Sequence, residues 1–260
     1  MRIHRTSSNG WVLWPGWCLH PPGRFAALSV PTAFIEHDLP RLHELMEHDS
    51  FALLVSQHAP ALVASHLPLL LDREAGEFGT LVGHMARANP QWQDLDRQLV
   101  LAVFSGPHCY VSPRWYESEH VVPTWNYVAV HAVGRVNLIE DRAQLRPIVR
   151  RMVDVYERSM PTPWSMPDEA SPFEDRLLDQ IVGFRIPIDS IEGKWKLNQN
   201  HPEARRQQVA RQLLAQGDEN SLAIASLFQE SFTDKSAVSE PESLSGSARC
   251  TPDFEGEVSV

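Results

Sequence analysis

The stretch Val122-Pro123-Thr124-Trp125-Asn126-Tyr127 opens a candidate strand that covers residues 125–132. Short apolar runs of the same kind, each bounded by polar or turn-forming residues, recur along the middle of the chain. They cover residues 51–55, 67–71, 80–85, 99–104, 109–112, 135–139 and 184–191. Many short strands at this spacing predict a β-barrel or a β-sandwich.

Helices are predicted between and after these strands, and the apolar spacing places them at residues 38–49, 141–158, 174–182, 202–216 and 221–232. Asp38 and Asp141 are candidate N-caps, and Asn89-Pro90 resembles the start of a further short helix. Gly217 closes the helix that ends at residue 216. The predicted fold class is therefore mainly β with flanking helices (α+β).

Both ends of the chain differ in composition from its middle. Residues 1–29 combine three tryptophans with glycines and prolines, which fits neither helix nor strand periodicity and predicts an irregular N-terminal extension. Residues 218–260 carry nine acids and two bases, and their Ser-, Glu- and Pro-rich end predicts an acidic, largely disordered C-terminal tail. The predicted folded domain covers residues 30–217.

Charge and cysteine content limit the classes of partner. The formal net charge is -10, of which the tail holds -7, so no strongly basic region exists to neutralise nucleic-acid phosphates. Three widely separated cysteines predict neither a disulfide framework nor a zinc site, and they favour a reducing cytoplasm. No apolar run reaches the length of a membrane span, so we expect no membrane partner.

Several catalytic templates are absent from the sequence. There is no HExxH or HxxxH metal motif, no GxSxG nucleophile elbow, no P-loop and no GxGxxG fingerprint, so no metal site is predicted. A short basic stripe, Arg142, Arg146 and Arg150, lies on one predicted helix face. A solvated helix face is the better interpretation of this stripe, because no helix-turn-helix pattern accompanies it.

Four motifs, in order, resemble the PaiB-like FMN-binding family of negative transcriptional regulators. They are Ser65-His66-Leu67-Pro68, Gly83-His84-Met85-Ala86-Arg87-Ala88-Asn89-Pro90, the stretch from Val122 to Tyr127, and Gly193-Lys194-Trp195-Lys196-Leu197-Asn198-Gln199-Asn200. The resemblance covers roughly residues 31–217. It implies a split β-barrel of the pyridoxamine-phosphate-oxidase type that works as a homodimer, with FMN at the subunit interface.

The first two motifs supply candidates for holding FMN. Arg87 is suited to forking onto phosphate oxygens, His84 is a hydrogen-bond donor, and Gly83 permits close approach of the backbone. Taken alone, this run is more often a turn with a solvated arginine, and only the family resemblance favours a phosphate site. Ser65, His66 and Leu67 are expected along the flavin ring, whereas the alternative for His66 is an ordinary histidine at a strand start.

The last two motifs supply three more candidates. Trp125 and Asn126 are expected close to the flavin, although tryptophans in strands more often pack a core or a dimer interface. The Lys- and Asn-rich stretch from residue 194 to 200 is predicted to be a loop after the last strand. In the family fold, late strands complete the site of the opposite subunit, so the resemblance implies that Lys196 adds charge from across the dimer.

Three functions remain open at this point. The family resemblance implies an FMN-binding negative transcriptional regulator, with DNA as a partner that the charge does not support. The alternative is an FMN-dependent reductase or oxidase of a small substrate. The third is a degenerate module whose pocket serves only dimer packing or another ligand.

Overall fold

The computed structural model describes residues 31–58, 60–116, 121–169 and 171–237. The predicted N-terminal extension and residues 238–260 of the predicted tail lie outside this part of the chain. The described residues form one antiparallel sheet in which the strand order is β3-β2-β6-β7-β9-β5-β4, with β1 and β8 also pairing with β9.

The strands are of very different lengths. Their bounds are β1 (Ile35–Glu36), β2 (Phe51–His58), β3 (Ala61–Pro68), β4 (Leu70–Asp72), β5 (Thr80–Ala86), β6 (Leu99–Val111), β7 (Thr124–Arg135), β8 (Asn137–Ile139) and β9 (Ile181–Lys196). The long strand β9 pairs with β7 along one half and with β5 along the other, so it joins the two halves of the barrel. The predicted fold class, a split β-barrel with flanking helices, is confirmed.

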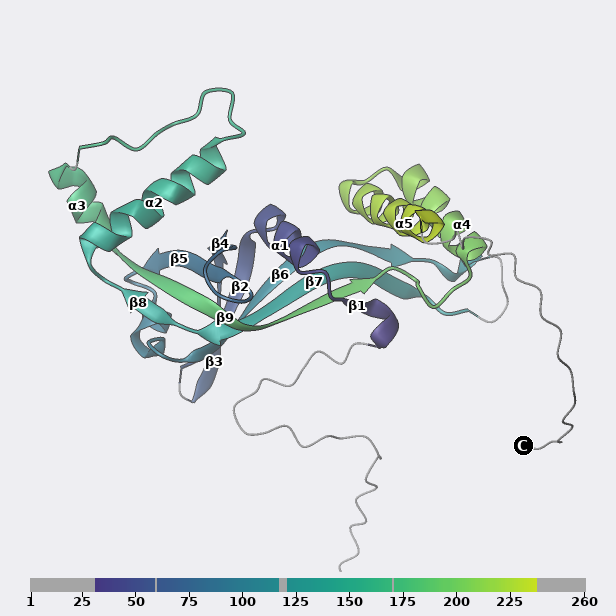
Figure 1. The fold of residues 1–260 in the computed structure, drawn as a ribbon, viewed down its shortest axis with the longest axis horizontal. Coiled ribbons are helices and arrows are strands. Elements are labelled where there is room, and N and C mark those ends of the chain that lie inside the picture. The colour runs from purple at the N-terminus through teal and green to yellow at the C-terminus, as the bar shows by residue number, and fades with distance from the viewer. Residues whose placement is uncertain (1–30, 59, 117–120, 170, 238–260) are drawn as a thin grey trace, which may run out of the picture.

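Helices lie at both ends of this sheet and over its middle. Their bounds are α1 (Leu39–His48), α2 (Arg142–Glu157), α3 (Pro172–Leu178), α4 (Glu203–Gln216) and α5 (Glu219–Ala237), with short 3-10 turns η1 (Thr32–Phe34), η2 (Pro90–Asp94) and η3 (Pro113–Tyr116). Figure 1 shows α2 and α3 at one end of the sheet, the α4–α5 hairpin at the other end, and α1 between them.

The predicted helix boundaries agree with the structure where a capping side chain or a glycine defines the helix end. The Asn89 and Asp141 side chains accept hydrogen bonds from the backbone N–H groups of Gln91 and Ala143, respectively, as N-caps do. Gly217 ends α4 in the left-handed region, with φ of 73°, which glycine adopts without a steric penalty. Asp38 occupies the N-cap position of α1, but its side chain makes no capping hydrogen bond.

Three of the predicted boundaries that differ from the structure are explained by tertiary contacts. Residues 181 and 182 were expected to be helical and residues 194–196 to be a loop, yet both segments belong to β9. Partner strands on its two sides provide ladder hydrogen bonds along nearly the whole length of β9, which overrides the local polar composition. The predicted tail includes α5, whose Ile224 and Phe228 are fully buried in the main core, so residues 219–237 belong to the folded body.

The core has two parts. The main cluster fills the barrel and continues beneath the α4–α5 hairpin, while a smaller cluster lies between β5 and α2. Close approach of α1 to β9 depends on Gly193, because an added Cβ there would lie 2.2 Å from Leu42 Cδ2. The glycine of the fourth motif is therefore a packing requirement of the sheet.

Candidate functional site

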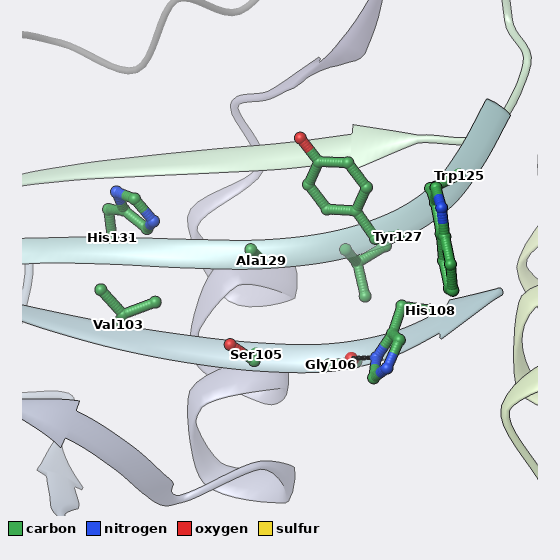
Figure 2. Close-up of a pocket in the computed structure, with 9 residues that line it drawn as sticks. Val103, Ser105, Gly106, His108, Trp125, Tyr127, Ala129 and His131 are labelled. Carbon is green, nitrogen blue, oxygen red and sulfur yellow. Dashed lines mark hydrogen bonds between the residues drawn. The ribbon is translucent and has the colours of Figure 1, made fainter. Parts of the chain in front are cut away.

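A groove of about 430 Å³ runs along the outer face of β6 and β7 (Figure 2). Successive side chains of a strand point to opposite faces, so Trp125, Tyr127, Ala129 and His131 all face outward from β7. The β6 side of the groove comes from Val103, Ser105, Gly106 and His108, with Val128 in the floor. A register shift between Ser105, which pairs with Ala129, and His108, which pairs with Tyr127, interrupts the ladder opposite Val128.

One end of the groove is aromatic and carries positive charge. Trp125, which is 53 % exposed, meets Tyr110 edge-to-face at a ring separation of 6.0 Å. The ammonium of Lys194 lies 5.3 Å from the Tyr127 ring centre, a cation–π contact. Lys196 donates a 2.8 Å hydrogen bond from Nζ to Thr124 Oγ1 beside the same end. These groups suit a flat aromatic ligand that carries negative charge.

The opposite end of the groove holds a neutral imidazole. Burial lowers the pKa of His131, and this effect outweighs the opposing charge of Glu192 on the neighbouring strand β9. Figure 2 shows His131 at the end of the groove away from Trp125. At neutral pH His131 therefore offers one hydrogen-bond donor and one acceptor.

The first family motif lies elsewhere, on the edge strand β3. Ser65 Oγ accepts a 2.9 Å hydrogen bond from Asn89 Nδ2, which ties β3 to the segment after β5. His66 is exposed and its ring stacks on Phe51 at 5.9 Å. Leu67 is partly buried against the main core. Ser65 and His66 face opposite sides of β3, since Ser65 lies level with the buried Leu54 and His66 lies level with the partly exposed Leu53. His66 therefore faces the same outer side of the sheet as the groove.

The second motif is more deeply built into the barrel than the sequence suggested. Gly83 was expected to allow close approach to a phosphate, but an added Cβ would lie 2.7 Å from Leu69 Cδ2 and 2.9 Å from Phe184 Cζ. The glycine is thus explained by core packing. His84 lies opposite Gly183 in the ladder, its Nδ1 is enclosed without a partner, and burial lowers its pKa.

Arg87 already has several partners in this structure. Its Nη1 donates to Glu140 Oε2 at 2.7 Å, and Nε and Nη2 donate to the backbone carbonyls of Asp179 and Ile181. The guanidinium also lies over the Trp92 ring, 5.4 Å from its centre. A phosphate at Arg87 has to compete with the Glu140 carboxylate.

Trp125 and Asn126 do not share a face, although the sequence analysis placed both beside the flavin. Asn126 faces the interior and is fully buried, while Trp125 faces the groove. The structure thus assembles the nine predicted residues in three places: Trp125 and Lys196 at the groove, Asn126 inside, and the other six around β3 and β5.

Tyr127, His131 and the β6 residues of the groove are not among the site residues predicted from the sequence. The period-two alternation that starts at Trp125 carried the signal for Tyr127 and His131. In the described part of the chain, no group of three His, Cys, Asp or Glu residues is arranged to hold a metal ion. Within the same residues, no helix combines the length and apolar character that crossing a membrane demands.

Residues 28–190 match a protein family described as "Putative FMN-binding domain". The chain belongs to this family. Its membership confirms both the predicted family resemblance and FMN as the predicted cofactor.

Relatives extend the match beyond the family domain. The chain is 33 % identical over 207 residues to "Protease synthase and sporulation protein PAI 2" of Bacillus subtilis, covering 78 % of this chain and 97 % of the relative. It is 27 % identical to an uncharacterised protein of Aspergillus fumigatus, covering 75 % of this chain and 94 % of the relative.

Solved structures resemble the chain more distantly. The flavocytochrome Anf3 from Azotobacter vinelandii has a TM-score of 0.48 at 17 % identity, covering 62 % of this chain and 69 % of its own. The FAD and heme binding protein from Mycobacterium smegmatis has a TM-score of 0.48 at 16 % identity, covering 62 % and 73 %. At these values, neither structure bears on the function of this chain.

Proposed function

We propose that the protein is an FMN-binding homodimer in which two protomers together enclose each flavin. The observation that carries this proposal is the division of the candidate ligand-binding residues between two regions. Ser65 and His66 on β3 are separated from Trp125 on β7 by the whole width of β2 and β6. Neighbouring strands lie about 4.8 Å apart, so β3 and β7 are about 14 Å apart across the sheet. The register places His131 level with His66, so Trp125 lies further along β7 as well. A second copy facing the first supplies the missing half of each site.

The outer sheet face beside the groove has the character of an interface. Leu53 on β2 lies next to Val103 on β6, and Val55 lies next to Leu101, which in turn lies next to Val133 on β7. All five side chains face outward and are only partly covered in the single chain. A partly exposed apolar patch of this kind favours burial against a partner of the same shape.

FMN fits the two regions in chemically distinct ways. Trp125 and Tyr127 present aromatic surface to a flat ring, and Lys194 and Lys196 add positive charge nearby. Arg87 provides a fork for a phosphate once Glu140 is displaced. The flavin supplies redox chemistry when bound, and these residues bind it and hold it in place. Asn126 is left out of this arrangement because its amide is enclosed.

For the regulatory role, we propose an indirect mechanism that does not depend on a DNA-binding surface on α2. The stripe predicted as the basic face of that helix is neutralised from within the chain. Arg142 pairs with Asp179, Arg146 pairs with Glu174 at 3.2 Å, and Arg150 pairs with Asp168 at 2.7 Å. These ion pairs tie α2 to α3 and to the segments on either side of α3, so the three guanidinium groups are already paired within residues 142–179.

An FMN-dependent oxidoreductase is the second candidate, and the open groove favours it. A small substrate can reach Ser105 and the neutral imidazole of His131 beside the aromatic wall. Such an enzyme oxidises NADH or NADPH and passes the electrons to an acceptor, whereas a purely regulatory flavoprotein does not turn over.

The purified protein tests both candidates. We expect bound flavin in the visible spectrum and a dimer mass by light scattering. Trp125→Ala should weaken FMN binding. Trp164→Ala should not, because Trp164 is similarly exposed but lies in the segment between α2 and α3, away from the groove. A monomeric mass with FMN bound at full strength would refute the shared site. Steady NADH oxidation with a small acceptor would favour the enzyme, and tight sequence-specific DNA binding at physiological salt would refute indirect regulation.

A further inference from the structure

Two of the family motifs meet on the inner face of β7 and β9, where the proposed flavin site does not reach. Asn126, from the third motif, is fully buried, and neither its Oδ1 nor its Nδ2 has a hydrogen-bond partner. Trp195, from the fourth motif, is 4 % exposed, and its Nε1 also lacks a partner. By contrast, the nearby buried Asn198 donates to the Tyr116 hydroxyl at 2.8 Å.

The sheet register brings the two unpartnered groups to the same space. Val128 lies opposite Trp195 and Tyr127 lies opposite Lys196, so Asn126 is the diagonal neighbour of Trp195 on the inner face. The benzene edge of the indole faces Gly193, where an added Cβ would lie 3.0 Å from Trp195 Cζ3. Because Nε1 lies on the other side of an indole ring from Cζ3, the N–H is directed away from Gly193.

The groups around the amide and the indole leave both without a partner. Arg41 of α1 lies over the Trp195 ring, 5.7 Å from its centre, but a guanidinium only donates and cannot accept the indole N–H. Cys109 lies directly opposite Asn126, and burial raises the pKa of its thiol to about 12, so it is a protonated and weak hydrogen-bond partner. The hairpin above contributes apolar side chains to the main core, among them Leu213, Ile224 and Phe228, each fully buried. These side chains have no hydrogen-bonding capacity.

We propose that Asn126 and Trp195 hold one or more water molecules in a sealed internal site. Buried polar groups are rarely left unpaired, because an unmet donor or acceptor costs its full desolvation penalty. Water both donates and accepts, and an enclosed water needs two to four polar partners, a number that the amide oxygen, the amide nitrogen and the indole N–H provide. This water links β7 to β9 at the point where the two motifs meet.

Water-exchange NMR on protein labelled with 15N-tryptophan tests this directly. The Trp195 indole signal, assigned from a Trp195→Phe variant, should show a dipolar cross-peak to a long-lived water. In Asn126→Leu, which replaces the amide with an apolar side chain of similar size, that cross-peak should be lost. Trp125, which is 53 % exposed, is the matched control and should show only fast exchange with bulk solvent.

Absence of the Trp195 cross-peak in the wild-type protein would overturn the proposal, and so would its persistence at full strength in folded Asn126→Leu. If the variant does not fold, a crystal structure of the wild-type protein decides the matter. Ordered density within hydrogen-bond distance of both Asn126 and Trp195 Nε1 supports the internal water. A dry, apolar contact at that point refutes it.

Discussion

Because Glu140 and the FMN phosphate compete for Arg87, removing the Glu140 charge should strengthen FMN binding. The ion pair joins Arg87 Nη1 to Glu140 Oε2 at 2.7 Å, and the two side chains are 34 % and 54 % exposed. A pair this exposed contributes about 0.2–1 kcal/mol. Glu140→Gln removes that competitor, so FMN should bind about 1.4- to 5-fold more tightly, since about 1.4 kcal/mol corresponds to a tenfold change in Kd.

Arg87→Ala should act in the opposite direction and more strongly. Each charge-assisted hydrogen bond that is lost costs about 1.5–3 kcal/mol, which corresponds to FMN binding that is weaker by about 10- to 150-fold. Quenching of flavin fluorescence during titration of the apoprotein measures both variants. Glu47→Gln is the matched control, because Glu47 forms a similarly exposed pair with Arg73, at 2.6 Å, away from the motif.

The result that refutes this reasoning is an unchanged Kd in both Glu140→Gln and Arg87→Ala, with melting temperatures that show both variants to be folded. Arg87 would then serve only to join the end of β5 to the backbone around residues 179–181. Equal tightening in Glu47→Gln would show a general charge effect instead of local competition.

Three further predictions concern stability and reactivity. Phe228→Ala should lower the free energy of unfolding by about 3–5 kcal/mol in urea denaturation, whereas Leu222→Ala, at a site 43 % exposed, should change it little; equal effects would mean that α5 is not docked. Burial lowers the pKa of both His84 and His131 below the value of about 6.5 expected in the unfolded chain, so protonation favours unfolding. The melting temperature should therefore be steady above about pH 6.5 and fall as the pH drops toward 5. In a His84→Gln, His131→Gln double variant the fall should be smaller. An equally large fall in that variant would assign the effect to other groups. Cys109, with its thiol pKa raised to about 12, should react with a disulfide reagent only on unfolding when it is the sole cysteine, and rapid labelling of the native protein would contradict its burial.

The sequence by itself determined the features that depend on neighbouring residues. Period-two alternation and turn residues located most of the sheet, and capping chemistry placed the helix starts after Asn89 and Asp141 and the helix end at Gly217. The ordered motifs identified the FMN-binding family, because four matches depend on residue identity and spacing alone. Trp125 and Asn126 were both expected beside the flavin, although period-two alternation places neighbouring residues of a strand on opposite faces.

Only the tertiary structure decided what each side chain meets. Arg87 is paired with Glu140, 53 positions away in the chain, and the α2 arginines are paired with carboxylates from α3 and the segments that flank it. Packing of the core made the Asn126 side of β7 an interior surface and left the Trp125 side as a groove. Sequence patterns record the periodicity of a strand, whereas burial and ion pairing arise from segments that only the folded chain brings together.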